Sequence, residues 1–173
     1  VMLHLLWGGL GMYLFLRGEG LRHSPALFGA VGFEALPKLF AHYGAGHLTL
    51  LYAIVWTPWL LWVCRKRTVR TGNDIRRALF SWEGLFLAII FLADVRWCAY
   101  AALLWFGFAL IGNLLQRPTK QPPVGIFRRL VPLFTQALLA AALAAPLALP
   151  LIEYTRLSTR SEMEAADILA YSL

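Results

Sequence analysis

Long apolar runs separated by short polar segments make up most of this sequence. A helix needs roughly 20 mostly apolar residues to cross the hydrocarbon core of a bilayer, which is about 30 Å thick. The runs show no alternation of apolar and polar positions, which favours helices over membrane strands. The pattern therefore predicts an all-α, polytopic transmembrane bundle of about six spans, at residues 1–16, 24–41, 47–64, 80–93, 97–115 and 127–151.

The apolar run from 80 to 115 is too long for one crossing and contains Asp94 and Arg96 near its middle. We therefore interpret it as a hairpin of two helices with these two residues at its outer tip. An acid and a base at such a turn commonly form a weak, solvated local cap. The alternative is that Asp94 and Arg96 line an outer cavity and hold a polar substrate.

The predicted span 24–41 has the weakest signal because it carries Glu34, Pro37 and Lys38. A carboxylate and an ammonium four residues apart can neutralise each other on one helix face. Charged groups inside a membrane helix are costly and often functional. The pair is therefore either a structural ion pair beside a proline kink or a pair of charges retained for function.

The basic residues set the orientation of the predicted spans. If six spans alternate, 12 of the 16 Lys and Arg fall on one side: Arg17, Arg22, Arg65, Lys66, Arg67, Arg70, Arg76, Arg77, Arg117, Lys120, Arg128 and Arg129. The other side carries Lys38, Arg96, Arg156 and Arg160. The positive-inside rule makes the first side cytoplasmic and predicts a multi-pass protein of the cytoplasmic (inner) membrane. Residues 1–152 then form the transmembrane domain, and residues 153–173 begin an extracytoplasmic segment.

Composition supports a membrane protein and argues against other classes. Apolar residues make up 60% of the chain and charged residues 14%, whereas soluble domains carry about 25% charged residues. The net charge of +7 lies in short clusters between apolar runs, so the expected partner is the lipid bilayer and not nucleic acid. The chain begins at Val1 inside an apolar run and stops at Leu173, and we interpret it as a fragment of a longer protein.

Candidate polar groups lie on the predicted outer side. His42 and His47 are five residues apart across glycines, a spacing that does not suit a metal pair on a helix, so we expect no metal site. They are either hydrogen-bonded interface residues or contacts to a phosphate or a sugar hydroxyl. Arg156 and Arg160 follow the last span, and arginine forks suit phosphates. With Tyr154 they equally fit plain interfacial anchors.

Several apolar motifs occur together along the chain. Residues 3–14 read LHLLWGGLGMYL, residues 46–51 read GHLTLL and are followed by Trp56-Thr57-Pro58, residues 149–160 read LPLIEYTRLSTR, and residues 165–173 read AADILAYSL. In order and spacing, these motifs resemble the YfhO-like bacterial membrane proteins over most of the chain. Each motif is degenerate by itself, so the match depends on their order.

The resemblance implies a GT-C-like architecture, with many transmembrane helices and chemistry on the extracytoplasmic side. Such proteins are similar to glycosyltransferases that take a sugar from a polyprenyl-phosphate carrier. The usual catalytic carboxylate of that class lies in the first outer loop, which would precede Val1, so no catalytic residue is assigned here. No cofactor is identified, and the chemistry allows a divalent metal ion at the phosphate in the full-length protein.

Two functions are expected on these grounds. The first is a fragment of a membrane glycosyltransferase, with His47, Asp94, Arg96, Arg156 and Arg160 lining the outer, substrate-binding cavity. The second is a non-catalytic integral membrane subunit or a transporter component. The chain shows no internal repeat and nearly all its charges lie at span ends, which weakens the transporter interpretation more than the subunit one.

Overall fold

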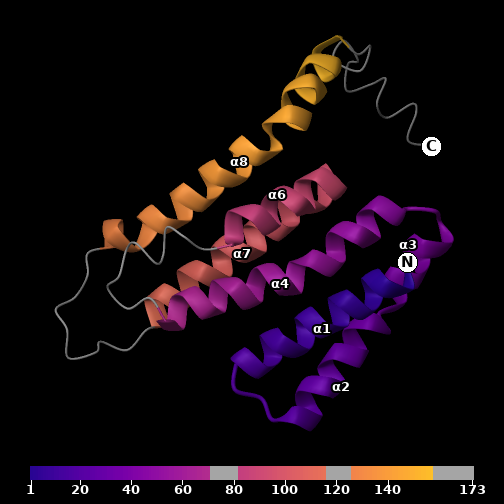
Figure 1. Ribbon diagram of the computed structural model, residues 1–173, viewed down its shortest axis with the longest axis vertical. Coiled ribbons are helices and arrows are strands. Elements are labelled where there is room, and N and C mark those ends of the chain that lie inside the picture. Colours follow the sequence, from indigo (N-terminus) through magenta and orange to yellow (C-terminus); the bar gives the residue numbers. More distant parts are fainter. Residues whose placement is uncertain (71–81, 116–125, 158–173) are drawn as a thin grey trace, which may run out of the picture.

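A computed structural model, shown in Figure 1, describes residues 1–70, 82–115 and 126–157. All regular secondary structure in these ranges is helical, which confirms the all-α prediction. The helices are α1 (Met2–Gly18), α2 (His23–Glu34), α3 (Pro37–Gly44), α4 (Leu48–Arg70), α6 (Glu83–Ala93), α7 (Val95–Leu115) and α8 (Ile126–Leu157).

Three helices are long and apolar enough to cross a membrane. The apolar stretches are Leu48–Arg67 of α4, Val95–Gly112 of α7 and Leu130–Leu157 of α8. Helix α6 is also apolar, but its 11 residues rise only about 16 Å at the helical rise of 1.5 Å per residue. The described part of the chain is therefore a helical bundle with three spanning-length helices, which indicates a membrane protein.

The segment predicted as one span at 24–41 consists of two helices. Helix α2 ends at Glu34 and α3 begins at Pro37, and between them Leu36 has a non-helical backbone with ψ of 123°. Proline disfavours the helical conformation in the residue before it and cannot donate a backbone hydrogen bond, whereas the first position of a new helix suits it. The expectation that Glu34 and Lys38 share one helix face is therefore wrong. Glu34 instead packs its side chain over Gly9 of α1.

Helix α1 lies alongside α4, and the two helices run in the same direction. Glycines of α1 allow their close approach. A Cβ atom at Gly8 would lie 2.9 Å from Cβ of Val55, and one at Gly11 would lie 2.6 Å from Nε1 of Trp59. The Trp59 indole donates a hydrogen bond of 3.0 Å to the backbone carbonyl of Trp7. Small residues are the usual means by which membrane helices bring their backbones together.

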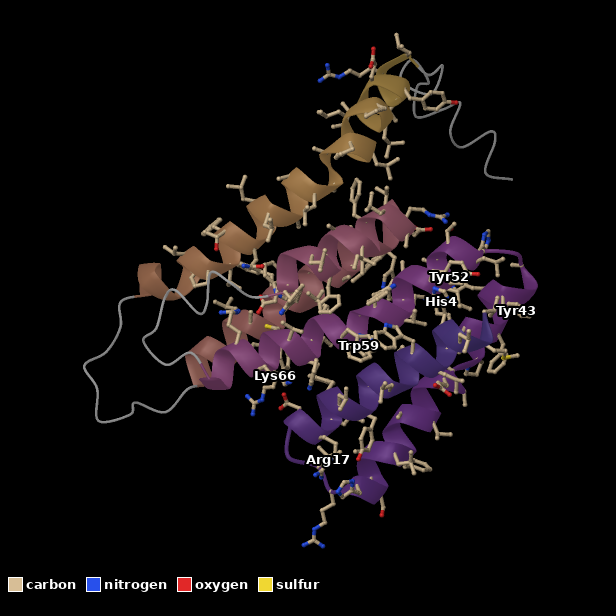
Figure 2. The ribbon with its side chains drawn as sticks, viewed as in Figure 1. His4, Arg17, Tyr43, Tyr52, Trp59 and Lys66 are labelled. Carbon is tan, nitrogen blue, oxygen red and sulfur yellow. The ribbon has the colours of Figure 1, made fainter. Side chains whose placement is uncertain are left out.

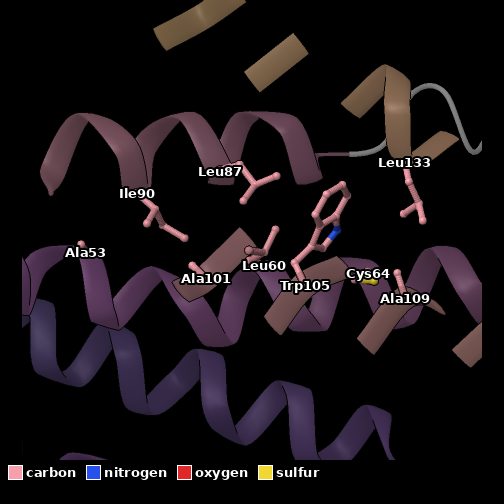
Figure 3. Close-up of a cluster of buried hydrophobic side chains, with 9 residues drawn as sticks. All are labelled: Ala53, Leu60, Cys64, Leu87, Ile90, Ala101, Trp105, Ala109 and Leu133. Carbon is pink, nitrogen blue, oxygen red and sulfur yellow. The ribbon is translucent and has the colours of Figure 1, made fainter. Parts of the chain in front are cut away.

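Helices α6 and α7 form the predicted hairpin, and it packs against α4 on one side and against α8 on the other (Figure 1). Figure 3 shows the buried apolar cluster at this junction. Its members are Ala53, Leu60 and Cys64 of α4, Leu87 and Ile90 of α6, Ala101, Trp105 and Ala109 of α7, and Leu133 of α8. Every long helix of this half of the bundle therefore contributes to one core.

Polar contacts define the two ends of the bundle. At one end, Arg65 of α4 forms a 3.0 Å ion pair with Glu19 in the turn between α1 and α2. At the other end, Thr49 in the first turn of α4 donates to Asp94 between α6 and α7. Arg17 at the end of α1, Arg22 before α2 and the basic residues at the end of α4 therefore lie at one end of the bundle, opposite the α6–α7 turn. This arrangement agrees with the predicted grouping of these basic residues on one side.

The exterior of the bundle is apolar. Leu3 is 80% exposed, Leu103 72% and Leu138 71%. The interior, in contrast, contains Glu83 and Gln136, both nearly or fully inaccessible. In water such an exterior would be strongly unfavourable, whereas in lipid it needs no cover.

The α1–α4 contact gives the first testable prediction. Replacing Gly11 with Ala places a methyl group against the Trp59 indole and obstructs its hydrogen bond to Trp7, because the two groups cannot occupy the same space. We expect a loss of about 1–3 kcal/mol in unfolding free energy, as in other overpacked cores. Thermal unfolding in detergent measures this loss.

The matched control is Gly32→Ala in α2, because a Cβ atom there meets nothing within 4 Å. This change also replaces a helical glycine with alanine, which by itself favours a helix by up to about 1 kcal/mol. Equal unfolding temperatures for the two variants would contradict close packing of α1 on α4.

Candidate functional site

The residues predicted for an outer site fall into two groups in the structure. His47, Asp94 and Arg96 lie at the end of the bundle where α4 begins and α6 meets α7. Arg156 lies in the last turn of α8, and its guanidinium is not among the groups that contact Asp94. Arg160 lies outside the described residues. The structure thus brings Asp94 and Arg96 into contact, and His47 lies at the same end of the bundle.

Asp94 organises the turn between α6 and α7. Its Oδ1 accepts the backbone N–H groups of Arg96, at 3.0 Å, and Trp97, at 3.2 Å, which is the geometry of a helix N-cap. Its Oδ2 accepts from the Nη2 of Arg96 at 2.9 Å and from the Thr49 hydroxyl at 3.4 Å. Both carboxylate oxygens are engaged and the residue is only 7% exposed. The structure therefore contains the local helix cap that was one of the two interpretations of Asp94, but the carboxylate of this cap is buried and not solvated.

These contacts also determine the acidity of Asp94. The hydrogen bond from the Arg96 side chain lowers the pKa of the Asp94 carboxyl below its usual value, while burial opposes the shift. The backbone donors of Trp97 and Arg96, together with the positive charge of Arg96, add to the lowering. Asp94 is therefore a fixed anion at neutral pH, and such a group is a poor general base.

Arg96 is the accessible member of this group. Its side chain is 69% exposed although Asp94 holds one edge of the guanidinium. At the same end of the bundle, His47 immediately precedes α4, and its ring centroid lies 5.9 Å from that of His42. His47 is exposed, and Thr49, two residues further on, is the residue that contacts Asp94. An anchored arginine and the exposed imidazole of His47 therefore occupy the same end of the bundle.

A second polar cluster, which the sequence analysis did not single out, lies inside the bundle. The Nε of Arg67 on α4 donates to Oε1 of Glu83 at 2.6 Å, and the side chains are 5% and 0% exposed. Trp105 of α7 donates its indole N–H to Oε2 of Glu83 at 2.8 Å. The Cys64 sulfur also lies within 3.9 Å of Nη2 of Arg67. One carboxylate therefore links α4, α6 and α7.

Gln136 extends this cluster to α8. Its Oε1 accepts the backbone N–H of Gly84, the first-turn residue that follows Glu83, at 2.8 Å. A Cβ atom at position 84 would lie 2.7 Å from the Gln136 carbonyl, so only glycine fits there without a shift.

The sequence signal for this cluster was a carboxylate directly beside an apolar run, followed by glycine. It could have drawn attention to Glu83, but its partner Arg67 was counted among the loop arginines.

Within residues 1–70, 82–115 and 126–157, no three His, Cys, Asp or Glu side chains gather closely enough to hold an ion.

Comparisons with protein-family models, curated proteins and solved structures found no match for this chain. The class that the fold defines is therefore an all-helical protein with three helices long and apolar enough to span a membrane. The resemblance to the YfhO-like proteins stays a prediction.

The Arg67–Glu83 pair gives the second testable prediction. Arg67→Met leaves a buried carboxylate without its cation, and such a loss typically costs about 3–5 kcal/mol. Adding Glu83→Gln removes the stranded charge while its amide oxygen can still accept from Trp105. We expect the double variant to recover most of the unfolding free energy lost in Arg67→Met, measured by detergent or denaturant unfolding.

The exposed Arg22→Gln serves as the control for removing one arginine and is expected to unfold like the parent protein. The single variant Glu83→Gln completes the comparison. If the double variant loses as much unfolding free energy as Arg67→Met and Glu83→Gln lose together, Arg67 and Glu83 are not energetically coupled.

The Asp94 cap gives a prediction about pH. Because the pKa of Asp94 is lower in the folded protein than its unfolded value of about 3.9, its charge stabilises the fold above that pH. This contribution is lost as pH falls through the folded-state pKa. Asp94→Asn keeps a capping side chain but has no charge to lose. The difference in unfolding temperature between the parent and Asp94→Asn should therefore narrow below about pH 4. A constant difference between pH 7 and pH 3 would be incompatible with this role.

Proposed function

We propose that the chain is the membrane-embedded part of a GT-C-type glycosyltransferase, which transfers sugars from a polyprenyl-phosphate donor on the extracytoplasmic side of the inner membrane. The proposal assigns six crossings to α1, the broken α2–α3 segment, α4, the segment that ends in α6, α7 and α8. The end that carries Glu19 and Arg65 then faces the cytoplasm. The end that carries His47 and Arg96 faces outward.

The observation that carries the proposal is the placement of Arg96. Its guanidinium is held at one edge by a buried carboxylate and is 69% exposed. An arginine fixed in this way retains N–H donors that can bind a phosphate without first paying the full entropy of ordering the side chain. The exposed His47 lies at the same end and supplies a further donor or acceptor for a sugar or phosphate oxygen.

The roles of the residues follow from this chemistry. Arg96 would bind the phosphate of the lipid carrier and stabilise the negative charge that develops as the sugar leaves. His47 would orient the donor. Asp94 positions Arg96 and is not the base, because both its oxygens already accept hydrogen bonds. The base that deprotonates the acceptor hydroxyl is not assigned to a residue of this chain.

The test is glycosyl transfer by the full-length protein in membranes or nanodiscs, with a polyprenyl-phosphate sugar as donor. Arg96→Gln removes the phosphate contact and is expected to lower kcat/KM at least about tenfold, within the range seen when a charge-stabilising donor is lost. Arg22→Gln, a charge-matched change at the opposite end of the bundle, is expected to leave kcat/KM unchanged.

Unchanged transfer by Arg96→Gln and by His47→Ala would remove this end of the bundle from the substrate site. Unfolding temperatures equal to that of the parent protein would establish that lost transfer does not reflect lost folding.

A second candidate is a non-catalytic integral membrane subunit or a transporter component. It is favoured by the full engagement of both Glu83 and Asp94, because a carboxylate that only joins helices is a structural group. Purification of the full-length protein as a fixed component of a larger complex without transferase activity would support this candidate over the first.

A further inference from the structure

The basic end of the bundle gathers positive side chains from two parts of the chain. Arg17 lies in the last turn of α1, Arg22 lies directly before α2, and Lys66 comes from the last turns of α4. All three are exposed. Figure 2 shows Arg17 and Lys66 at the same end of the bundle, opposite the end that carries His4 and Tyr43.

The described carboxylates at this end form ion pairs with other arginines. Glu19 forms an ion pair with Arg65, at 3.0 Å, and Glu83 forms one with Arg67. Within the ranges that the structure describes, no carboxylate pairs with Arg17, Arg22 or Lys66. The surface therefore carries excess positive charge on exposed groups, beside pairs that are already neutral.

The turn between α1 and α2 holds Arg17 in place. Gly20 has a φ of +94°, a conformation that favours glycine, and it reverses the chain directly after α1. Nη1 of Arg17 then donates to the carbonyl of Leu21 at 2.7 Å. One edge of the guanidinium is thus fixed along the turn. Its other N–H donors remain accessible for an oxygen ligand.

Trp62 connects the α4 side of this surface to the turn. Nζ of Lys66 lies 3.5 Å from the centroid of the Trp62 ring, which is a cation–π contact. A Cβ atom at Gly18 would lie 3.8 Å from Cδ1 of the same ring. The indole therefore lies between the end of α1 and Lys66. Tryptophan prefers the headgroup level of a bilayer, which places this surface where lipid phosphates are found.

We propose that Arg17, Lys66 and Trp62 form a binding site for the headgroup of an anionic phospholipid, with Arg22 adding to its positive charge. The phosphate would accept from Arg17 and Lys66, and the acyl chains would extend along neighbouring apolar surface. Phe28 and Leu27 of α2 provide such surface, with exposures of 81% and 59%. This apolar neighbourhood favours a lipid over a free phosphate or a nucleic acid, neither of which has apolar chains to bury. The site does not depend on the proposed transferase activity.

The experiment measures lipid binding to the full-length protein purified in a neutral detergent. Native mass spectrometry with phosphatidylglycerol and, separately, phosphatidylcholine gives the affinity for each lipid. We expect selective binding of phosphatidylglycerol. Arg17→Gln and Lys66→Gln should each weaken it about fivefold, as expected for loss of one basic residue at a membrane surface.

Lys38→Gln is the matched control, because Lys38 is exposed on α3 and lies outside the basic end. It removes the same charge and should leave phosphatidylglycerol affinity unchanged. Equal unfolding temperatures in phosphatidylcholine nanodiscs would verify that the three variants fold alike.

Three results would overturn the proposal. The first is equal affinity for the two lipids. The second is an equal loss of affinity in Lys38→Gln and in Arg17→Gln, which would indicate only a diffuse effect of net charge. The third is full displacement of phosphatidylglycerol by millimolar inorganic phosphate, which would identify a site for free anions and not for a lipid.

Discussion

The carboxylate of Glu83 is the group on which the packing of α4, α6 and α7 depends. A charge without exposure to solvent is tolerable only when it is paired and hydrogen-bonded, and Glu83 satisfies both conditions through Arg67 and Trp105. These three residues belong to three different helices, so the charge is stabilised only when the helices occupy their native positions. Apolar packing alone would tolerate sliding of one helix along another, since the Leu, Ile and Ala side chains of the core have no required hydrogen-bond partners. The ion pair therefore selects one register among several that would bury similar apolar area.

Glycine performs a related task on the other side of α4. In a membrane, lipid tails are as apolar as leucine, so helices gain little from apolar burial and depend on close contact and hydrogen bonds. Gly8 and Gly11 allow α1 to approach until the Trp59 indole reaches the backbone carbonyl of Trp7. That carbonyl is one of the few polar groups a helix can offer to a neighbour. On this face of α4, close approach and polar contact thus occur at the same place.

The sequence predicted the helical class, the hairpin with its tip at Asp94 and, among the described residues, the grouping of Arg17, Arg22 and Arg65 at one end, because each leaves a local signal. Apolar runs reveal long helices, and a charge inside such a run reveals a turn. The break between α2 and α3 was also signalled, by Pro37, but the run was treated as continuous because its apolar content outweighed one proline.

The pairing of Arg67 with Glu83 was not predictable in this way. It joins residues from two helices, and Arg67 looks like any other member of a basic loop until the helix that contains it is known to extend that far. Asp94 shows the same limit, since only the three-dimensional arrangement reveals that its oxygens are already occupied.

Helix α8 differs from the rest of the bundle in its length and its few neighbours. Its 32 residues rise about 48 Å, which exceeds the hydrocarbon thickness of about 30 Å by several turns. Among the helices that the structure describes, α6 is its main partner, so little holds the second half of α8 at a fixed angle. Pro146 and Pro150 weaken the backbone hydrogen bonds of that half. A helix of this kind adapts to a thinner membrane by inclining further and to a thicker one by standing more upright. In a bilayer, such tilting would keep Tyr154 and Arg156, at the end of α8, near the headgroups of membranes that differ in thickness.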